Sequence, residues 1–404
     1  MSTPSPRSSP NNLSADARFA RSVPYPSQIS NSPRPVVHRL PPAQTLNDIH
    51  TSGTTGRPKG VLYDHRSIVL HAMSLLMVDS FAISENDTVM PIVPMFHVNA
   101  WGLPYAALMS GANIVMPGPL MAPENLIAAL DRHRVSVAAA VATVWQNAVP
   151  FLQGRRLDSL RRVISGGGAL PVSLSKTYLD TIGLPLSSSW GMTETSPLVC
   201  SARIPSDQEA TSPEEHVAML ATPGPPTPLC SLRIVDQDGN EVARDGTTSG
   251  ELQVCGPTIA GGYFGMSADT EAFTDDGWLR TGDVATIDPR GFVRIVDRTK
   301  DLIKSGGEWI SSVELENEIV GMVGVAEAAV IAMPDVKWGE RPCAFVVTHA
   351  GYDVTAQDVR DHLRGKVANW WIPEQVLVVE SLPKTATGKL AKASLRSSLA
   401  YPAL

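Results

Sequence analysis

The sequence predicts an α/β protein, in which a large domain of parallel α/β sheet and a small β subdomain are followed by a small α+β domain. Between residues 45 and 171, apolar segments of strand length alternate with segments of helical spacing. Glycine-rich or polar motifs follow several of these strands, as expected where a parallel sheet binds its ligands. Short strands with turn residues between them begin near residue 224 and predict the β subdomain. Mixed helical and strand patterns from about residue 300 onward predict the last domain.

Length and composition narrow the class of protein. A chain of 404 residues is long enough for two or more domains. Its 43% hydrophobic and 18% charged residues are typical of soluble globular proteins, and its net charge of −7 argues against a general nucleic-acid binder. No apolar run reaches the ~18 residues of a transmembrane helix. The four cysteines lie far apart, which favours buried thiols over a disulfide framework or a zinc site: Cys200, Cys230, Cys255 and Cys343.

Residues 1–44 differ in composition from the rest of the chain. They are rich in Ser and Pro and contain five arginines but a single acid, Asp16. Such a segment cannot bury a core, so we expect a disordered tail. The Arg and Ser bias also occurs in organellar transit peptides. However, such peptides form an amphipathic helix, which the many prolines oppose. A cytoplasmic location is therefore favoured over organellar import. The predicted domains are this tail, a large domain over 45–299 and a small domain over 300–404.

Individual elements follow from hydrophobic periodicity and from helix-capping signals. In the large domain we expect strands over 45–50, 88–93, 112–116, 135–144 and 161–164, and helices over 64–80, 103–110 and 123–133. The β subdomain should contain strands 232–235, 250–254 and 291–296. The small domain should contain strands 328–332 and 376–379 and two helices, one starting at Ser311 and one over 355–368. Both helices begin with capping boxes, Ser311 with Glu314 and Thr355 with Asp358.

The segment Thr51–Gly60 combines hydroxyls, glycines and a lysine. Glycine lets the backbone approach a ligand closely, and successive free N–H groups can form an anion-binding nest. Thr, Ser and Lys side chains can donate hydrogen bonds to phosphate oxygens. The spacing is not that of a Walker loop. A mobile turn would have the same composition, so this segment alone leaves phosphate binding and a plain turn as alternatives.

Other polar residues with suitable chemistry follow the predicted strands. His97, Gly166–Gly168 and Glu194 fall at strand ends, where an open parallel sheet binds ligands. Glu194 is a hard oxygen ligand suited to Mg²⁺, and Thr193 can donate to a phosphate. An ordinary loop acid and a structural histidine are the alternatives for Glu194 and His97.

Two more candidates lie in the second half of the chain. Asp283 next to a glycine can accept hydrogen bonds from ribose hydroxyls, as acids do in nucleotide sites, although a turn aspartate would have the same surroundings. Lys389 ends a loop that we expect to be exposed. Its long, flexible ammonium could enter an active site, whereas most lysines lie on the surface without such a role.

Five separated signatures occur in one order along the chain: Thr51–Gly60, Pro94–Trp101, Trp190–Pro197, Thr281–Asp283 with Asp297–Gly307, and Pro383–Lys389. Together they resemble the adenylate-forming, AMP-binding superfamily of acyl-CoA synthetases, luciferases and peptide-synthetase adenylation domains. The resemblance extends from residue 45 to the end. Two segments are most similar to the bacterial-type medium- and long-chain fatty-acyl-CoA ligases: Pro94–Trp101 and Asp297–Ile310.

The resemblance implies a set of residues around ATP. The phosphates would be held by the hydroxyl, glycine and lysine residues of the first signature: Thr51, Ser52, Gly53, Thr54, Thr55 and Lys59. Glu194 would bind Mg²⁺, and Thr193 would contact the α-phosphate. The adenine and acyl pockets would be lined by glycines with three further residues nearby: Gly166, Gly167, Gly168, Trp190, Gly191 and Met192. Asp283, assisted by Arg298, would hold the ribose hydroxyls.

The resemblance also implies residues for the acyl group, the thiol and the domain movement. His97 would stand where the acyl group meets the thiol, and Lys389 would be the adenylation lysine. Lys300 matches the hinge about which the small domain turns. Three residues would pass close to the pantetheine arm: Ser305, Gly306 and Gly307.

The implied reaction has two halves. A carboxylate attacks the α-phosphorus of ATP and pyrophosphate leaves; the thiol of CoA then attacks the acyl-adenylate and AMP leaves. No covalent enzyme intermediate is required, so catalysis rests on positioning and charge stabilisation. The implied ligands are ATP, Mg²⁺, CoA and a carboxylic acid, for which a medium- or long-chain fatty acid is favoured. A homodimer is an open alternative to a monomer.

Members of this superfamily carry a long folded region before the phosphate loop, whereas 50 residues precede it here. We therefore expect an N-terminally truncated member in which on the order of 100 residues, the size of a small domain, are absent. Two alternatives to an acyl-CoA synthetase follow. One is a catalytically impaired homologue that binds nucleotide or a partner, and the other is an adenylating enzyme with an acceptor other than CoA.

Overall fold

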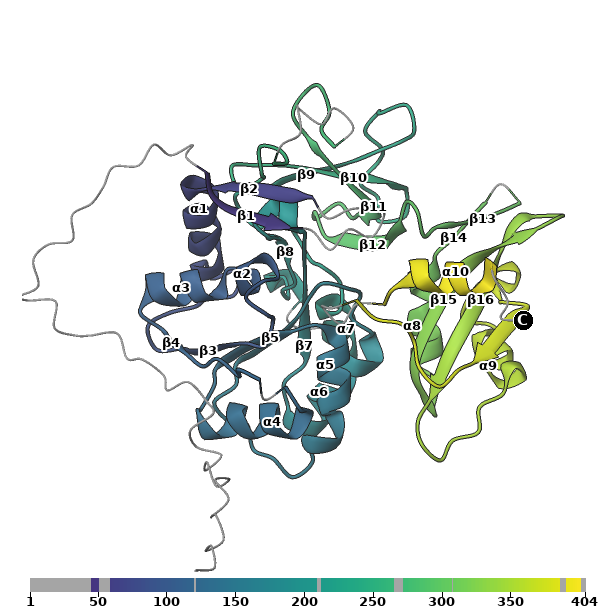
Figure 1. Cartoon of the computed structure of the whole chain (residues 1–404), viewed down its shortest axis with the longest axis horizontal. Coiled ribbons are helices and arrows are strands. Elements are labelled where there is room, and N and C mark those ends of the chain that lie inside the picture. The colour runs from purple at the N-terminus through teal and green to yellow at the C-terminus, as the bar shows by residue number, and fades with distance from the viewer. Residues whose placement is uncertain are drawn as a thin grey trace, which may run out of the picture.

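The computed structural model describes residues 45–50, 59–119, 121–208, 212–264, 272–306, 308–385 and 390–400. The predicted tail 1–44 lies outside these ranges, as do Thr51–Thr55, Gly307 and Lys389. Within the described ranges, no helix has the length and apolar character needed to cross a membrane. Figure 1 shows a larger unit beside a smaller one. The larger unit contains the three sheets built from β1 to β12, and the smaller unit contains the sheet built from β13 to β17.

The centre of the larger unit is a six-stranded sheet in the order β4-β3-β5-β6-β7-β8. Its strands are β3 (Thr88–Pro91), β4 (Asn113–Ile114), β5 (Val137–Ala140), β6 (Arg162–Ser165), β7 (Leu186–Gly191) and β8 (Leu198–Ser201). All neighbours run parallel except β7 and β8, which pair antiparallel. The predicted parallel α/β sheet is confirmed, with an antiparallel strand at one edge.

Helices pack against both faces of this sheet. They are α1 (His65–Leu76), α2 (Val98–Trp101), α3 (Leu103–Ser110), α4 (Pro123–Arg132), α5 (Ala142–Ala148), α6 (Val172–Ile182) and α7 (Pro213–Leu220). Alternate strand residues face opposite sides, so Val89 joins a core cluster with Leu75 of α1, and Met90 joins a second cluster with Trp145 of α5. Both faces are buried, so β5 is a continuous apolar run, whereas β7 buries three serines, Ser187, Ser188 and Ser189.

One predicted strand of the larger unit is partly wrong. The sequence predicts a strand over 135–144, but β5 ends at Ala140, and Ala142 begins helix α5. An apolar run without periodicity cannot distinguish a buried strand from a buried helix, and this run contains both. The helix predicted over 64–80 is shorter, because Asp64 is its N-cap, where it accepts the Ser67 N–H at 2.6 Å, and Met77 is its C-cap.

Two smaller sheets complete the larger unit. β1 (Thr45–His50) and β2 (Gly60–Asp64) pair antiparallel with His50 opposite Gly60, so the predicted phosphate loop connects these strands. The other sheet has the antiparallel order β12-β11-β10-β9, from β9 (Ser231–Val235), β10 (Ser249–Cys255), β11 (Leu279–Ile287) and β12 (Val293–Arg298). It confirms the predicted β subdomain. The four cysteines are free; three are buried, and Cys255 is half-buried.

The smaller unit is a sheet with helices packed on it. Its strands are β13 (Ile303–Ser305), β14 (Glu308–Ile310), β15 (Val325–Asp335), β16 (Gly339–Thr348) and β17 (Gln375–Val378), and its helices are α8 (Ser312–Val320), α9 (Ala356–Leu363) and α10 (Lys392–Ala400). One core cluster lies on each face, around Val330 and around Ile331. The predicted α+β character of this region is confirmed.

Both predicted helix starts in the smaller unit are confirmed by their caps. Ser311 accepts the N–H of Glu314 at 3.1 Å, and Thr355 and Asp358 form a reciprocal capping box. The second helix is shorter than predicted. It ends at Leu363 because the chain becomes extended at the next residue and Gly365 then adopts a φ of 77°.

Candidate active site

The parallel strands bring several predicted site residues to one edge of the large sheet. β3 leads to the turn with His97, β6 leads directly into Gly166–Gly168, and β7 ends at Gly191, three residues before Glu194. Because β3, β5, β6 and β7 are parallel, their carboxyl ends lie at the same edge. The structure thus places these motifs, which are far apart in sequence, around a common edge.

A left-handed turn supports one side of this edge. In α2 (Val98–Trp101), which follows His97, every residue has a positive φ between 50° and 58°. Each non-glycine residue in this conformation costs roughly 1–2 kcal/mol, and such strain occurs mainly at functional sites. The turn places the Trp101 ring, 7% exposed, against Gly166: a Cβ on Gly166 would lie 2.9 Å from that ring and 2.9 Å from Ser189 Oγ. Only glycine fits there without displacing these side chains.

Glu194 lies in a short 3₁₀ turn, η3 (Thr193–Thr195), and is 8% exposed. Its Oε1 accepts a hydrogen bond of 2.8 Å from the hydroxyl of Tyr263. A buried carboxylate favours a nearby cation, and Mg²⁺ typically binds one or two protein carboxylates together with substrate phosphates. Among the described residues, no three His, Cys, Asp or Glu side chains gather into a complete protein metal site. Glu194 could therefore supply one protein carboxylate to a cation whose other ligands come from outside the described residues.

Tyr63 of β2 fixes the backbone of the same turn. Its hydroxyl donates a hydrogen bond to the carbonyl oxygen of Thr193. Burial, followed by the charge of Glu194, raises the pKa of Tyr63, so its hydroxyl stays protonated and available as a donor. The strand that follows the predicted phosphate loop is therefore joined to the turn that carries Glu194.

The predicted ribose site is assembled across two strands and a third segment. Asp283 of β11 lies opposite Arg298 of β12 in the antiparallel register, and Arg298 Nε lies 3.5 Å from Asp283 Oδ1. Trp190 Nε1 donates to Asp283 Oδ2 at 2.9 Å. Asp283 is therefore a strand residue and not the turn residue of the alternative interpretation. The three predicted residues lie in contact, and one hydrogen bond and one ion pair hold the carboxylate in one orientation.

The other predicted residues of the larger unit lie around this centre. Lys59 is exposed, and its Nζ lies 4.6 Å from the centroid of the Tyr263 ring. Gly167 has a φ of 77°, and Gly168 is exposed. Met192 is partly buried and is the N-cap of the turn with Glu194.

The residue predicted for the hinge lies just after β12, and those predicted for the pantetheine arm belong to the smaller unit. Lys300 follows β12, where burial and then the Arg298 guanidinium lower its pKa. Ser305 is buried in β13 and accepts a hydrogen bond of 3.3 Å from Arg341 Nη1. Gly306 has a φ of 63° and packs on Trp338, whose ring would lie 2.9 Å from a Cβ at that position. Ser305 thus lies in a different sheet from Asp283, and Gly306 follows it in a turn.

Sequence reasoning missed Tyr63, Tyr263 and His71. The two tyrosines contact the Glu194 turn through their hydroxyls. His71 contacts Leu198, which follows that turn in the chain. No local pattern identifies them, because each contacts a partner that is between 69 and 130 residues away. For His71 the sequence indicated only the apolar face of a helix.

His71 of α1 lies between Leu198, at the start of β8, and Gly102, which follows the left-handed turn. Its Nε2 accepts the N–H of Leu198 at 3.1 Å, and a Cβ on Gly102 would lie 2.6 Å from its Nδ1. The side chain is 2% exposed, and burial lowers its pKa to about 3. The ring is therefore neutral at pH 7, and because Nε2 accepts, the proton is assigned to Nδ1.

We expect this histidine to make stability depend on pH. Between pH 6.5 and 3 the unfolded chain binds a proton at His71 that the folded chain excludes, so the free energy of unfolding decreases as pH falls. From pH 6.5 to pH 5 the loss is about 2 kcal/mol. Denaturant unfolding of the wild type and His71→Gln at both pH values measures it. The glutamine oxygen can still accept from Leu198, so the variant should lose about 2 kcal/mol less. If the wild type and His71→Gln lose the same free energy of unfolding between the two pH values, His71 is not the neutral, buried group described above.

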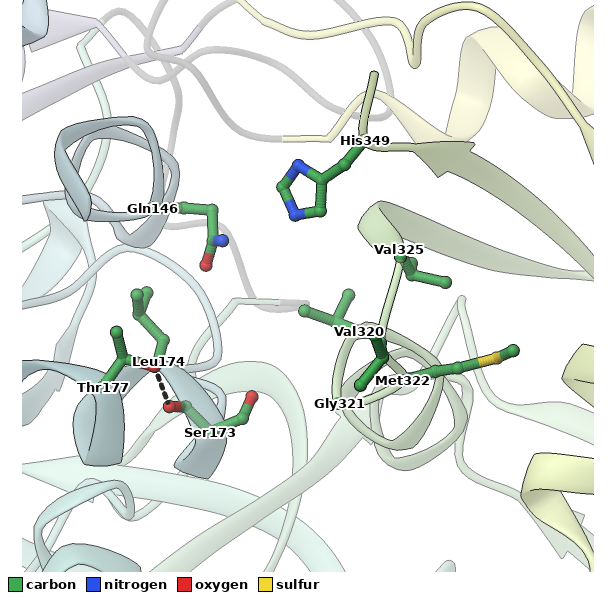
Figure 2. Close-up of a pocket in the computed structure, with 11 residues that line it drawn as sticks. Gln146, Ser173, Leu174, Thr177, Val320, Gly321, Met322, Val325 and His349 are labelled. Carbon is green, nitrogen blue, oxygen red and sulfur yellow. Dashed lines mark hydrogen bonds between the residues drawn. The ribbon is translucent and has the colours of Figure 1, made fainter. Parts of the chain in front are cut away.

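A cavity of about 190 Å³ lies where the smaller unit meets the larger one. Figure 2 shows Gln146 of α5 and Thr177 of α6 on one side of it and Val320, the last residue of α8, on the other side, with His349 at one end. None of the predicted site residues lines it. The cavity is a feature of the contact between the two units and is separate from the edge that carries Glu194.

Two family models match the chain. The model of the AMP-binding enzyme family matches residues 5–264, and the model of the AMP-binding enzyme C-terminal domain matches residues 314–389. The chain therefore belongs to the AMP-binding enzyme family. The predicted resemblance to adenylate-forming enzymes is confirmed.

Among curated proteins, the chain is similar to fatty-acid ligases. It is 46% identical over 362 residues to a long-chain-fatty-acid–CoA ligase of Thermus thermophilus, a match that covers 89% of this chain and 66% of that protein. It is 43% identical over 349 residues to a medium-chain-fatty-acid–CoA ligase of Ectopseudomonas oleovorans, covering 86% and 64%. The chain thus spans somewhat less than two thirds of the length of these relatives.

Solved structures show the same fold. ATP-bound MatB from Rhodopseudomonas palustris superposes with a TM-score of 0.77 at 29% identity, covering 87% of this chain and 67% of that one. The o-succinylbenzoate CoA synthetase MenE from Bacillus subtilis, in complex with its acyl-adenylate intermediate, gives 0.75 at 31% identity, covering 86% and 68%. The predicted fold class is therefore confirmed.

Proposed function

We propose that this chain activates a carboxylic acid with ATP and transfers the acyl group to CoA. The observation that carries the proposal is the arrangement around the segment Trp190–Glu194. At one end Trp190 and Arg298 hold Asp283, and at the other end Tyr263 holds Glu194. A ribose acceptor held at one end of this short segment and a cation ligand at its other end suit the binding of a nucleoside triphosphate with its metal ion.

In the first half-reaction, the carboxylate of the acid attacks the α-phosphorus of ATP, the bond to the bridging oxygen breaks, and pyrophosphate leaves. Thr51–Thr55 and Lys59 would hold the phosphates, Thr193 would donate to the α-phosphate, and Asp283 would fix the ribose. When bound through Glu194, Mg²⁺ would neutralise charge on the phosphate oxygens. Lys389 would bring a further positive charge to the reacting group.

In the second half-reaction, the thiol of CoA attacks the acyl carbonyl, AMP leaves with the bonding electrons, and the thiol proton passes to solvent. Ser305, Gly306 and Gly307 would line the path of the pantetheine arm, and His97 would stand beside the acyl carbonyl. Lys300 would serve as the hinge that turns the smaller unit, with Lys389, away from the adenylate. The use of donors and cations without a nucleophile–base pair agrees with this scheme.

A medium- or long-chain fatty acid is the proposed substrate. The names of the relatives support this class.

The test is pyrophosphate release by the purified chain with ATP, Mg²⁺ and short-, medium- and long-chain fatty acids plus an aromatic acid. We expect release that requires a fatty acid, and acyl-CoA detected by mass spectrometry when CoA is added. Pyrophosphate release without acyl-CoA would indicate a different acceptor. No release from folded, monodisperse protein would exclude the proposed activity and leave nucleotide binding as the alternative.

A further inference from the structure

The segment from Ala260 to Phe264 connects two parts of the proposed ATP site that are far apart in sequence. The N–H of Ala260 donates to the carbonyl oxygen of Glu194 at 2.8 Å. The N–H of Phe264 donates to the carbonyl oxygen of Gly60 at 2.7 Å, and Val61 and Tyr263 form an antiparallel bridge. This segment therefore joins the strand after the predicted phosphate loop to the turn that carries Glu194.

The side chain of Tyr263 also contacts both parts of the proposed ATP site, through its hydroxyl and through its ring. Its hydroxyl donates to Glu194 Oε1 at 2.8 Å, and the Nζ of Lys59 lies 4.6 Å from the centroid of its ring. The first contact is a hydrogen bond to a carboxylate, and the second is a cation–π contact with the ring face. One partly buried tyrosine thus touches the proposed metal ligand and a proposed phosphate ligand.

The hydrogen bond has a consequence for metal binding. A carboxylate offers about four lone-pair sites, so one donated bond to Oε1 leaves capacity for a cation while it fixes the rotation of the group. Without the hydroxyl, the Glu194 carboxylate would have to be ordered when the metal binds. Ordering a side chain at that moment weakens binding.

The ring contact has a separate consequence for the phosphates. A lysine on an exposed strand end has many rotamers, and freezing them on binding costs affinity. The ring face of Tyr263 holds the ammonium of Lys59 next to β2, where the predicted phosphate loop ends.

We propose that Tyr263 is a positioning residue that prepares two ligands of the Mg²⁺–ATP complex, Glu194 through its hydroxyl and Lys59 through its ring. This inference rests on the proposed function, since it assigns Tyr263 to the same nucleotide site. The two contacts predict separable effects, because phenylalanine keeps the ring and leucine removes both groups.

The experiment measures ATP binding to the full chain by calorimetry, without acid or CoA, over a series of Mg²⁺ concentrations. In Tyr263→Phe we expect the Mg²⁺ concentration for half-maximal binding to rise about tenfold, as for a lost hydrogen bond to a charged group, with ATP affinity at saturating Mg²⁺ within about twofold of wild type. In Tyr263→Leu the Mg²⁺ requirement should rise as much, and ATP affinity at saturating Mg²⁺ should also fall by about threefold to tenfold.

Tyr178→Phe is the matched control. Tyr178 is a fully buried tyrosine, and its hydroxyl likewise donates to an oxygen, the Trp145 carbonyl at 2.9 Å, in the core between α5 and α6. This variant should lower the melting temperature and leave the Mg²⁺ requirement unchanged. If Tyr263→Phe behaves in the same way, Tyr263 is a structural residue and the proposal is overturned.

The same measurement separates this inference from the proposed reaction. A wild-type chain that binds Mg²⁺–ATP but releases no pyrophosphate with any acid would exclude the reaction, and the shift in Tyr263→Phe would still support the positioning role. A wild-type chain that does not bind ATP, or that binds it equally well with and without Mg²⁺, would overturn the inference directly.

Discussion

Replacing Glu194 by Gln is expected to lower pyrophosphate release, with ATP, Mg²⁺ and a fatty acid, by about 100- to 1,000-fold without unfolding the protein. The charge is the property removed. Glutamine has nearly the same volume, and its amide oxygen can still accept the Tyr263 hydroxyl that now reaches Oε1 at 2.8 Å. The turn should therefore keep its shape while it loses its affinity for a cation.

The effect is measured as the rate of pyrophosphate release at saturating Mg²⁺, together with the melting temperature. Glu214→Gln is the matched control, because Glu214 is an exposed acid on α7 whose Lys176 partner lies 3.7 Å away. It removes the same charge at the surface, where an ion pair contributes little, so both rate and melting temperature should stay close to wild type. A loss of less than tenfold in Glu194→Gln would exclude Glu194 as the metal ligand.

The fold was predictable where local patterns and burial agree. The strand and helix alternation identified the parallel sheet because β3, β5 and β6 are short, mainly apolar strands, and helices α3 and α4 have clear starts and ends. The pattern failed over 135–144, where the apolar strand Val137–Ala140 is followed after one residue by the helix Ala142–Ala148, whose first residues are also mostly apolar. There the change of conformation is decided by packing against the sheet, which no local signal records.

The site was predictable to the extent that its chemistry lies in local motifs. Glu194 and Asp283 are recognisable from their neighbours, but the residues that orient them are 69 and 93 positions away in sequence, Tyr263 for the first and Trp190 for the second. Trp190 was expected near the adenine pocket, and its bond to Asp283 follows only from the folded chain. Orientation of a side chain is a tertiary property, so sequence spacing alone cannot reveal it.

The turn Val98–Trp101 shows the same limit for the backbone. It contains no glycine, and a β-branched valine is among the residues least suited to a positive φ, yet all four residues adopt one. Packing of Trp101 against Gly166 and burial of Val98 and Ala100 accompany this conformation. The local preference of these residues is for negative φ angles, so the surrounding structure must stabilise the left-handed turn.

Replacing Gly191 by Ala is expected to destabilise the fold by about 3 kcal/mol or more and to disrupt the site at the same time. A Cβ at this position would lie 1.9 Å from the carbonyl oxygen of Pro197 and 2.8 Å from its carbonyl carbon. Both are backbone atoms, so no side-chain rotation can relieve the overlap, and the end of β7 must separate from the start of β8. That separation would move Trp190 away from Asp283.

Gly168→Ala is the matched control for stability. No atom lies within 4 Å of a Cβ at Gly168, and the residue is exposed, so its unfolding free energy should stay within about 0.5 kcal/mol of wild type. Denaturant unfolding of both variants gives the comparison, and calorimetry with ATP tests the site in Gly191→Ala. If Gly191→Ala has the same unfolding free energy as wild type, the backbone around Pro197 can move aside without destabilising the fold. The close pairing of β7 and β8 would then not be what holds Trp190 and Glu194 in place.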